Sequence, residues 1–115
     1  MSQHADCIFC KIVSGQIPSR KAYEDDELLA FHDIHPWAPV HVLVIPKRHI
    51  AMLSDAQPDD SPWLGRMLAL VPRLMKEQGV TNGFRTVINT GQDGGQEVYH
   101  LHLHAYGGPR PWAKG

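Results

Sequence analysis

Apolar and polar residues alternate along the chain in a pattern that predicts short elements around one long helix. Between residues 8 and 13 apolar side chains recur every four positions, which predicts a short helix that Gly15 ends. Strand-like runs at residues 21–23 and 28–32 flank four consecutive acidic residues that favour a turn. These two runs therefore predict a β-hairpin.

The middle of the chain predicts a central strand followed by the long helix. Residues 41–45 are largely apolar and β-branched, and Pro46 ends the run. The helix should begin at residues 58–62, where Asp or Ser can cap it and a proline suits the first turn, and end at Gly79. Its predicted buried face, with a period of 3.6, consists of Leu64, Met67, Leu68, Val71, Leu74 and Met75. Pro72 should kink this helix or remove one backbone hydrogen bond.

Two further strands, Phe84 to Asn89 and Glu97 to Tyr106, are predicted on either side of a flexible glycine-rich loop at residues 91–95. No internal repeat or low-complexity segment divides the chain. We therefore expect a single domain over residues 1–115, with the proline-containing residues 109–115 as an extended tail. A short helix, strands, one long helix and more strands predict an α+β fold with an antiparallel sheet.

Composition and charge exclude several classes of protein. Hydrophobic residues make up 43% of the chain and charged residues 20%, which argues against intrinsic disorder. The net charge of -1 gives no broad basic footprint for nucleic acid. No apolar stretch approaches the roughly 20 residues of a membrane span, and the first six residues lack the features of a signal peptide. We expect a cytoplasmic protein with no nucleic-acid or membrane partner.

Histidine is abundant, with 8 residues, and three of them alternate with leucine in the run His100-Leu-His-Leu-His104. On a strand these imidazoles would share one face, about 7 Å apart along the backbone, while Leu101 and Leu103 pack against the long helix. The pattern suits a zinc site, because His-x-His presents two imidazoles to one ion, and it also suits nucleophilic and acid–base catalysis. Spacing alone does not separate these two interpretations.

The two cysteines, Cys7 and Cys10, are separated by two residues. This spacing lets two thiolates reach one tetrahedral zinc ion. The alternatives are two reduced, buried apolar side chains or a redox pair, and the redox pair is disfavoured because no βαβ pattern surrounds it.

These motifs together resemble the histidine triad (HIT) family, and specifically its Hint-like branch. The run His100-Leu-His-Leu-His-Ala-Tyr106 matches the family signature of histidines alternating with apolar residues. The other matching segments, spread over nearly the whole chain, are residues 6–12, 17–18, 23–26, 30–34, 38–49, 89, 94–100 and 107–108. The resemblance implies a HIT-like fold with a five-stranded antiparallel sheet, one long helix and one short N-terminal helix, and a sheet that extends across a homodimer.

The resemblance also implies an activity, because Hint-like proteins hydrolyse the P–N bond of purine nucleoside 5′-phosphoramidates, which are AMP or GMP derivatives of amines. By this resemblance His102 attacks the α-phosphorus and forms a nucleotidyl-histidine that water then hydrolyses. His104 would contact the phosphate and assist proton transfer to the leaving amine, and His41 matches a fourth active-site histidine. The alternatives are a dinucleoside polyphosphate hydrolase or nucleotidyl transferase of the same superfamily, a non-catalytic nucleotide-binding regulatory module, and a protein that binds metal through the three histidines.

Substrate-binding positions follow from the same resemblance. Asp33 would bind the ribose hydroxyls with Ile34 along that edge, and Asn89 would hydrogen-bond near the phosphate or ribose. Backbone amides would face the phosphate, as oxyanion stabilisation requires, from Gly94, Gly95, Gln96 and Glu97. The apolar slot for the purine would consist of Ile8, Phe9, Ile12 and Phe31. Each of these residues also has an ordinary explanation as a turn former or a core residue.

One position departs from the family pattern, since Glu97 stands where many members carry a serine that faces the leaving group. A carboxylate there could pair with a cationic amine, or it could repel the phosphate. The tail at residues 109–115 would lie near the partner's site, with Trp112 as an anchor.

Structural zinc is the one cofactor that the resemblance implies. In family members that keep the cysteine pair, the remaining two ligands match His49 and His100. The implied ligand set is therefore Cys7, Cys10, His49 and His100, which would remove His100 from acid–base duty. His4, His32 and His35 have no assigned role.

Overall fold

The computed structural model describes residues 6–114, which form one sheet with a helix on each face. The elements follow in the order α1 (Ile8–Ser14), β1 (Lys21–Glu24), β2 (Leu28–His32), β3 (Val40–Pro46), η1 (Leu53–Asp55), η2 (Pro58–Asp60), α2 (Ser61–Glu77), β4 (Phe84–Val87) and β5 (Leu103–Gly107). The strands lie in the order β1-β2-β3-β5-β4, and every neighbouring pair is antiparallel. The predicted α+β fold, with its five-stranded sheet, long helix and short N-terminal helix, is confirmed.

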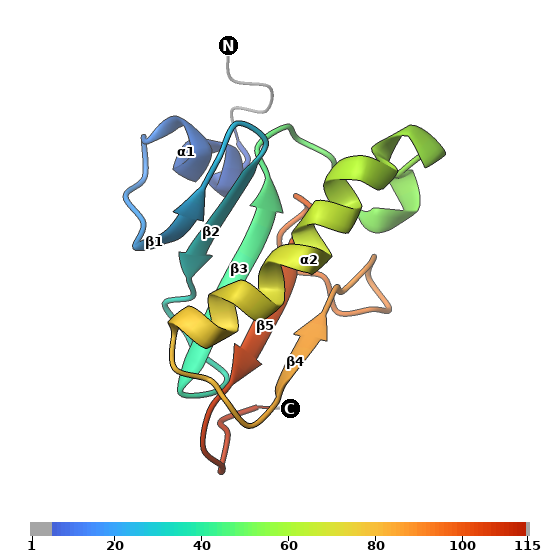
Figure 1. Cartoon of the computed structure of the whole chain (residues 1–115). Helices are drawn as coiled ribbons and strands as arrows, with labels where there is room; N and C mark the ends of the chain where they lie inside the picture. The colour runs from blue at the N-terminus through green and yellow to red at the C-terminus, as the bar shows by residue number, and fades with distance from the viewer. Residues whose placement is uncertain (1–5, 115) are drawn as a thin grey trace.

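The two faces of the sheet carry separate apolar cores. In Figure 1, α2 lies across one face over β3 and β5. Helix α1 packs against the opposite face, beside β1 and β2. The core under α2 includes Val42, Val44, Leu101, Leu103 and Ala105. The core on the α1 side consists of Phe9, Ile12, Leu29, Phe31, Leu43 and Ile45. Strand β3 contributes to both cores, which explains why residues 42–45 are an unbroken apolar run.

Helix α2 follows the predicted period at most positions. Met67, Val71 and Leu74 are buried as expected, but Leu68 is 53% exposed and Leu70 is buried instead. Leu68 lies about 100° around the helix from Met67, so it falls at the edge of the buried stripe and reaches solvent. Pro72 lies within the helix without ending it. It does remove one backbone hydrogen bond, because proline has no N–H donor.

The last strand is shorter than predicted, since β5 begins at Leu103 and residues 97–102 are not strand. The ladder with β3 ends at the pair Val44 and Leu103, and beyond it the Leu101 N–H donates to the Ile50 carbonyl at 2.7 Å. The chain leaves the sheet there because its backbone bonds a different segment. Strand β4 also ends early, at Val87 rather than Asn89.

The glycine at the end of α1 has the role that the sequence predicted. Gly15 caps α1 in the left-handed region at φ 85, where a side chain would be strained, and its N–H donates to the Ile12 carbonyl. Among the described residues, no helix has both the length and the apolar character needed to cross a lipid bilayer.

Candidate active site and metal centre

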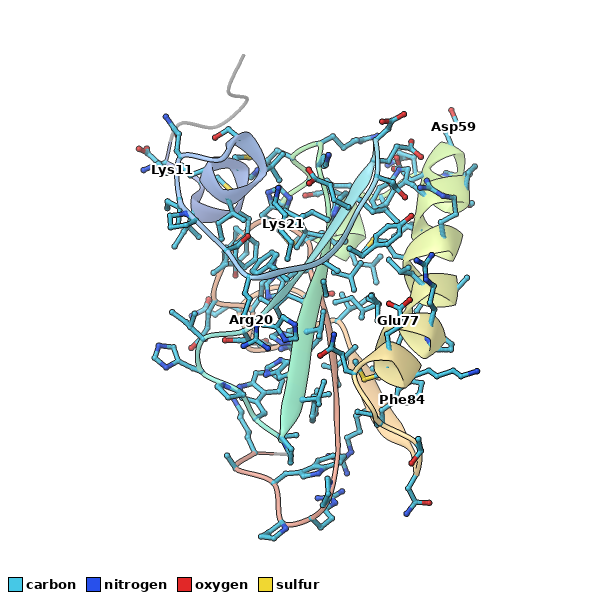
Figure 2. The ribbon with its side chains drawn as sticks, turned by 60° about the vertical axis from the view of Figure 1, so that its left-hand side comes forward. Lys11, Arg20, Lys21, Asp59, Glu77 and Phe84 are labelled. Atoms are coloured by element: carbon cyan, nitrogen blue, oxygen red, sulfur yellow. The ribbon has the colours of Figure 1, made fainter. Side chains whose placement is uncertain are left out.

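A pocket of about 750 Å³ opens on the side of the sheet that carries α1. Arg20, one of its lining residues, lies on the opposite side of the sheet from α2, which carries Glu77 (Figure 2). The predicted site residues that line this pocket are Ile8, Phe9, Ile12, Phe31, Asp33, Ile34, Asn89, Gly95, Glu97, His102 and His104. The structure therefore brings together, in one cavity, predicted residues from α1, two strands and two loops.

His102 is held in one tautomer by the backbone. Its Nδ1 lies 2.8 Å from the His100 carbonyl oxygen, which can only accept, so Nδ1 carries the proton and donates. The Nε2 atom therefore has a lone pair. The imidazole is only 6% exposed, and burial lowers its pKa, while the bond to the His100 carbonyl and the charges of Asp33 and Glu97 oppose that shift. The result is a neutral imidazole with a nucleophilic nitrogen in the pocket.

His41 and His104 form a second hydrogen-bonded unit. The Trp37 backbone N–H donates to His41 Nδ1 at 3.0 Å, so the proton of neutral His41 lies on Nε2. His41 Nε2 lies 2.9 Å from His104 Nδ1 and donates to it, which leaves the His104 proton on Nε2. Burial lowers the pKa of His104 to about 3, and the charges of His102, His41 and Lys114 add to this effect. The unit thus offers an N–H donor, at His104 Nε2, at neutral pH.

Asp33, in the loop after β2, lies next to His41 of this unit. Its Oδ1 accepts the His35 N–H at 2.8 Å, and its Oδ2 lies 3.7 Å from His41 Nε2. Burial lowers the pKa of His41, and the Asp33 charge opposes that shift. His32 and His35, which had no predicted role, also line the pocket, and His4 lies outside the described residues.

The apolar wall of the pocket comes mainly from α1 and β2. The rings of Phe9 and Phe31 meet edge to face at 5.6 Å, and Phe9 also meets His102 edge to face at 5.1 Å. Ile8 and Ile34 are 46% and 85% exposed at the rim. Such a wall beside polar groups suits a flat, partly polar ligand such as a nucleobase.

Gln96 does not line the pocket, although the sequence placed it with the phosphate-binding residues. Its side chain is buried, with Oε1 accepting the Gly91 N–H at 2.9 Å and Nε2 donating to the carbonyls of Ala51 and Val98 at 2.8 and 3.0 Å. Its backbone N–H donates to the Gly91 carbonyl, and the Gly95 N–H donates to the Gln92 carbonyl. These two amides therefore donate within the turn at residues 91–96, called the glycine turn below, and do not point into the pocket.

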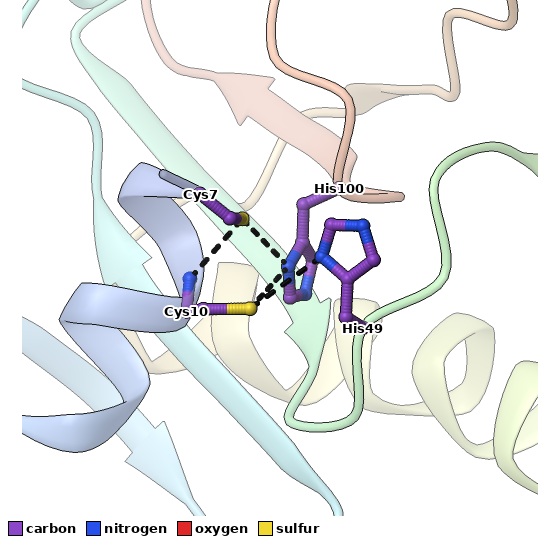
Figure 3. A group of neighbouring side chains, drawn as sticks. All are labelled: Cys7, Cys10, His49 and His100. Atoms are coloured by element: carbon purple, nitrogen blue, oxygen red, sulfur yellow. Dashed lines mark hydrogen bonds between the residues drawn. The ribbon is translucent and has the colours of Figure 1, made fainter. Parts of the chain in front are cut away.

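A second cluster lies beside the pocket, where α1 meets the segments after β3 and before β5 (Figure 3). The ligand atoms of Cys7, Cys10, His49 and His100 all lie within 4.8 Å of one another. Cys7 Sγ is 3.3 Å from His100 Nδ1, and Cys10 Sγ is 3.4 Å from His49 Nδ1 and 3.6 Å from His100 Nδ1. The two cysteines form no disulfide.

The donor set of this cluster fits a tetrahedral zinc ion. With Zn–S near 2.3 Å and Zn–N near 2.0 to 2.1 Å, a tetrahedral site separates sulfur from nitrogen by about 3.5 Å, which agrees with the observed distances. His100 Nε2 donates to the Pro46 carbonyl at 2.8 Å, so the lone pair of Nδ1 turns towards the thiols. The first triad histidine is thus separated from His102 and His104, contrary to the interpretation of all three as ligands of one ion.

Trp37 and Lys114 are among the pocket residues that the sequence did not predict. Lys114 donates its backbone N–H to the Trp37 carbonyl at 3.0 Å, and its Nζ lies 4.5 Å from the centre of the Trp37 ring. The Trp112 indole donates to the Gly108 carbonyl, so the tail folds against its own chain. The position of Trp37 between two prolines, four residues before His41, was the available signal.

A further pocket of about 560 Å³ lies between the turn before β4 and the C-terminal segment. Arg85, Arg110 and Trp112 are among its lining residues, and none of them is a histidine, a cysteine or an acid. The reactive groups therefore concentrate in the larger pocket.

Comparisons with known proteins agree with this geometry. A family model described as scavenger mRNA decapping enzyme C-term binding matches residues 6–112. Protein HitA of Neisseria gonorrhoeae is 52% identical over 104 residues, which are 90% of this chain and 97% of that protein. The crystal structure of a HIT family hydrolase from Legionella pneumophila Philadelphia 1 has a TM-score of 0.88 at 47% identity, covering 91% of this chain and 95% of that one. A Zn-bound histidine triad family protein from Mycobacterium smegmatis has a TM-score of 0.77 at 36% identity, covering 87% and 73%.

Proposed function

The chain belongs to the histidine triad family, and we propose that it hydrolyses the P–N bond of purine nucleoside 5′-phosphoramidates through a nucleotidyl-histidine on His102. The observation that carries the proposal is the state of His102, whose Nδ1 proton is fixed by the His100 carbonyl while Nε2 keeps its lone pair. Neighbours that are HIT family hydrolases support a hydrolytic reaction. The pocket supplies the remaining groups that the reaction needs.

In this mechanism the purine lies against the apolar wall and Asp33 binds the ribose hydroxyls. His102 Nε2 attacks the α-phosphorus, the P–N bond breaks, and the amine leaves with a proton that solvent delivers to its nitrogen. His104 contacts the phosphate through its Nε2–H and assists this proton transfer. Water then attacks the phosphorus, releases the nucleoside monophosphate and restores His102, so that one difficult step becomes two easier ones. The water that attacks in this second step returns one proton to solvent, so the protons balance over the cycle.

The fixed Nδ1 proton matters after the attack as well as before it. Phosphorylation of Nε2 leaves the imidazole positively charged while Nδ1 keeps its hydrogen. The bond to the His100 carbonyl then becomes charge-assisted, and the charges of Asp33 and Glu97 favour the cation as they do for protonated His102. These groups should therefore stabilise the nucleotidyl-histidine relative to the free imidazole.

The test is hydrolysis of an adenosine phosphoramidate by the wild type and by His102→Ala. We expect His102→Ala to lose at least about 10³-fold in kcat while it still binds AMP, because only the nucleophile is removed. His35→Ala, which deletes an exposed imidazole at the rim, should stay within about 3-fold. Turnover retained by His102→Ala would contradict covalent catalysis and leave a nucleotide-binding module as the better description.

We also propose that Cys7, Cys10, His49 and His100 bind a structural zinc ion. A bound ion would tie α1 to the segments after β3 and before β5 and take no part in the reaction. The Zn-bound relative from Mycobacterium smegmatis supports this proposal. Elemental analysis of protein purified without added metal should give about one zinc per chain, and Cys10→Ser should lose most of it while His102→Ala keeps it. Zinc near zero in the wild type would contradict the proposal.

We further propose that the protein is a cytoplasmic homodimer whose sheet continues across both subunits. Strand β4 is at one end of the strand order, so its outer edge is available for pairing with a second copy. Thiols placed for metal binding rather than in a disulfide suit a reducing compartment. Sedimentation or size-exclusion measurements should give twice the chain mass of 12.9 kDa, and a particle of a single chain would contradict the dimer.

A further inference from the structure

Trp37 touches both members of the His41–His104 unit. It lies in the loop between β2 and β3, is half-buried, and lines the pocket. Its ring centre is 4.2 Å from that of His104 with the planes at 19°, and 4.6 Å from that of His41 at 44°. Its backbone N–H is the donor that sets the tautomer of His41. A single residue thus contacts the pair through both its backbone and its side chain.

The stacked indole supplies a constraint that hydrogen bonding alone does not give. Rotation about the broad χ2 torsion of His104 moves Nδ1 as well as Nε2, so the bond from His41 opposes large rotations, but one hydrogen bond tolerates a moderate tilt of the ring. Rotation about that torsion would swing Nε2 within the pocket. An indole lying nearly parallel to the imidazole restricts this rotation, because tilting the ring would lose the stacked contact.

Trp37 is itself held in place from two directions. The Lys114 N–H donates to the Trp37 carbonyl, and the Lys114 ammonium lies over the indole. The Tyr106 ring meets the indole edge to face at 5.2 Å. The loop and the tail therefore form a support for the His104 ring.

We propose that Trp37 is a positioning residue, whose indole holds the His104 imidazole so that its Nε2–H points into the pocket. The kinetic consequences rest on the proposed function, but the placement of the ring does not. The variants Trp37→Phe, Trp37→Leu and Trp37→Ala all keep the backbone N–H to His41, so they isolate the contribution of the indole face.

The first test needs no turnover. Long-range proton–nitrogen NMR spectra of wild type should show His104 with its proton on Nε2 and a single sharp signal set. Trp37→Phe should preserve this state, because a phenyl ring can still stack, whereas Trp37→Leu and Trp37→Ala should give averaged or multiple His104 signals while His41 keeps its proton on Nε2, since the backbone N–H that sets its tautomer remains. A single unaltered His104 signal in Trp37→Leu would overturn the proposal. Leucine keeps part of the apolar volume of tryptophan, so Trp37→Leu allows the NMR test even if Trp37→Ala does not fold.

The second test is a double-mutant cycle on hydrolysis of an adenosine phosphoramidate. Trp37→Leu should lower kcat by about 10-fold or more with KM within about 3-fold, because misplaced groups slow the step more than they weaken binding. In a His104→Gln background the same change should cost less than about 2-fold, since no imidazole remains to position. Equal losses in both backgrounds would show that Trp37 acts independently of His104 and would overturn the proposal.

The matched control is Leu68→Ala, which shortens an exposed apolar side chain on α2, on the face of the sheet opposite the catalytic pocket. It should leave kcat within about 2-fold. If wild type hydrolyses no phosphoramidate, the proposed function fails, and the NMR result still decides whether Trp37 positions His104.

Discussion

The buried side chain of Gln96 should contribute more to stability than any other polar group of the glycine turn. It makes three hydrogen bonds to backbone groups, at Gly91, Ala51 and Val98, and it joins the turn to the segment after β3. Each such bond contributes about 1 kcal/mol net, and removing the side chain leaves three backbone groups without these partners. Gln96→Ala should therefore lower the free energy of unfolding by about 3 kcal/mol.

The assay is urea unfolding of zinc-loaded protein at fixed concentration, followed by circular dichroism, with the slope m compared between variants. Gln92→Ala, on the exposed side of the same turn, is the control and should change stability by less than about 0.5 kcal/mol. Gln96→Glu should be at least as harmful as the alanine at neutral pH, because it places a carboxylate against two carbonyl oxygens. A loss below about 0.5 kcal/mol in Gln96→Ala would refute the reasoning.

Three other outcomes follow from the site and its surroundings. The pKa of His104 is about 3 when folded against 6.5 for the ordinary value, so below pH 6.5 the unfolded chain binds more protons. The free energy of unfolding should accordingly fall as pH drops from about 6.5 towards 3, and His104→Gln should flatten this slope in urea titrations. A Cβ on Gly94 would lie 2.3 Å from the Thr90 carbonyl oxygen, so Gly94→Ala should lower the urea midpoint. Gly65→Ala, on the exposed face of α2, should instead raise the free energy of unfolding by about 0.5 to 1 kcal/mol. A Gly94→Ala variant more stable than Gly65→Ala would contradict this account. Glu97→Ser should slow hydrolysis of a lysyl phosphoramidate more than that of one with a neutral amine, and equal changes on both would end the idea that Glu97 recognises a cationic leaving group.

Periodicity was sufficient to predict most of the fold. Burial of a strand or of one helix face leaves a regular pattern of apolar residues in the sequence. Such patterns are the apolar run at residues 41–45 and the spacing of Met67, Val71 and Leu74. The alternation of Leu101 and Leu103 with histidines likewise placed the leucines under α2. The extent of β5 could not be predicted in this way, because Leu101 has the alternation of a strand residue while its N–H bonds to Ile50 outside the ladder.

The candidate site, like the fold, could be predicted where sequence patterns indicate the residues and could not where long-range contacts place them. Cys7 and Cys10 are close in sequence, and the resemblance added His49 and His100, which the structure places beside them. Gln96 does not line the pocket, although its neighbours Gly95 and Glu97 do, because its side chain hydrogen-bonds to backbone groups instead. Trp37 was not assigned, because its role depends on β3 and β5 lying side by side, a long-range pairing with no local signal.

Direct observation of the intermediate tests the central claim most sharply. Protein mixed with an adenosine phosphoramidate and quenched within one turnover should gain the mass of one adenylyl group, and digestion should locate it on the peptide that carries His102. The label should be absent from His102→Ala and present in His35→Ala. Rapid hydrolysis by wild type with no adenylylated histidine, or with the label on another residue, would contradict attack by His102.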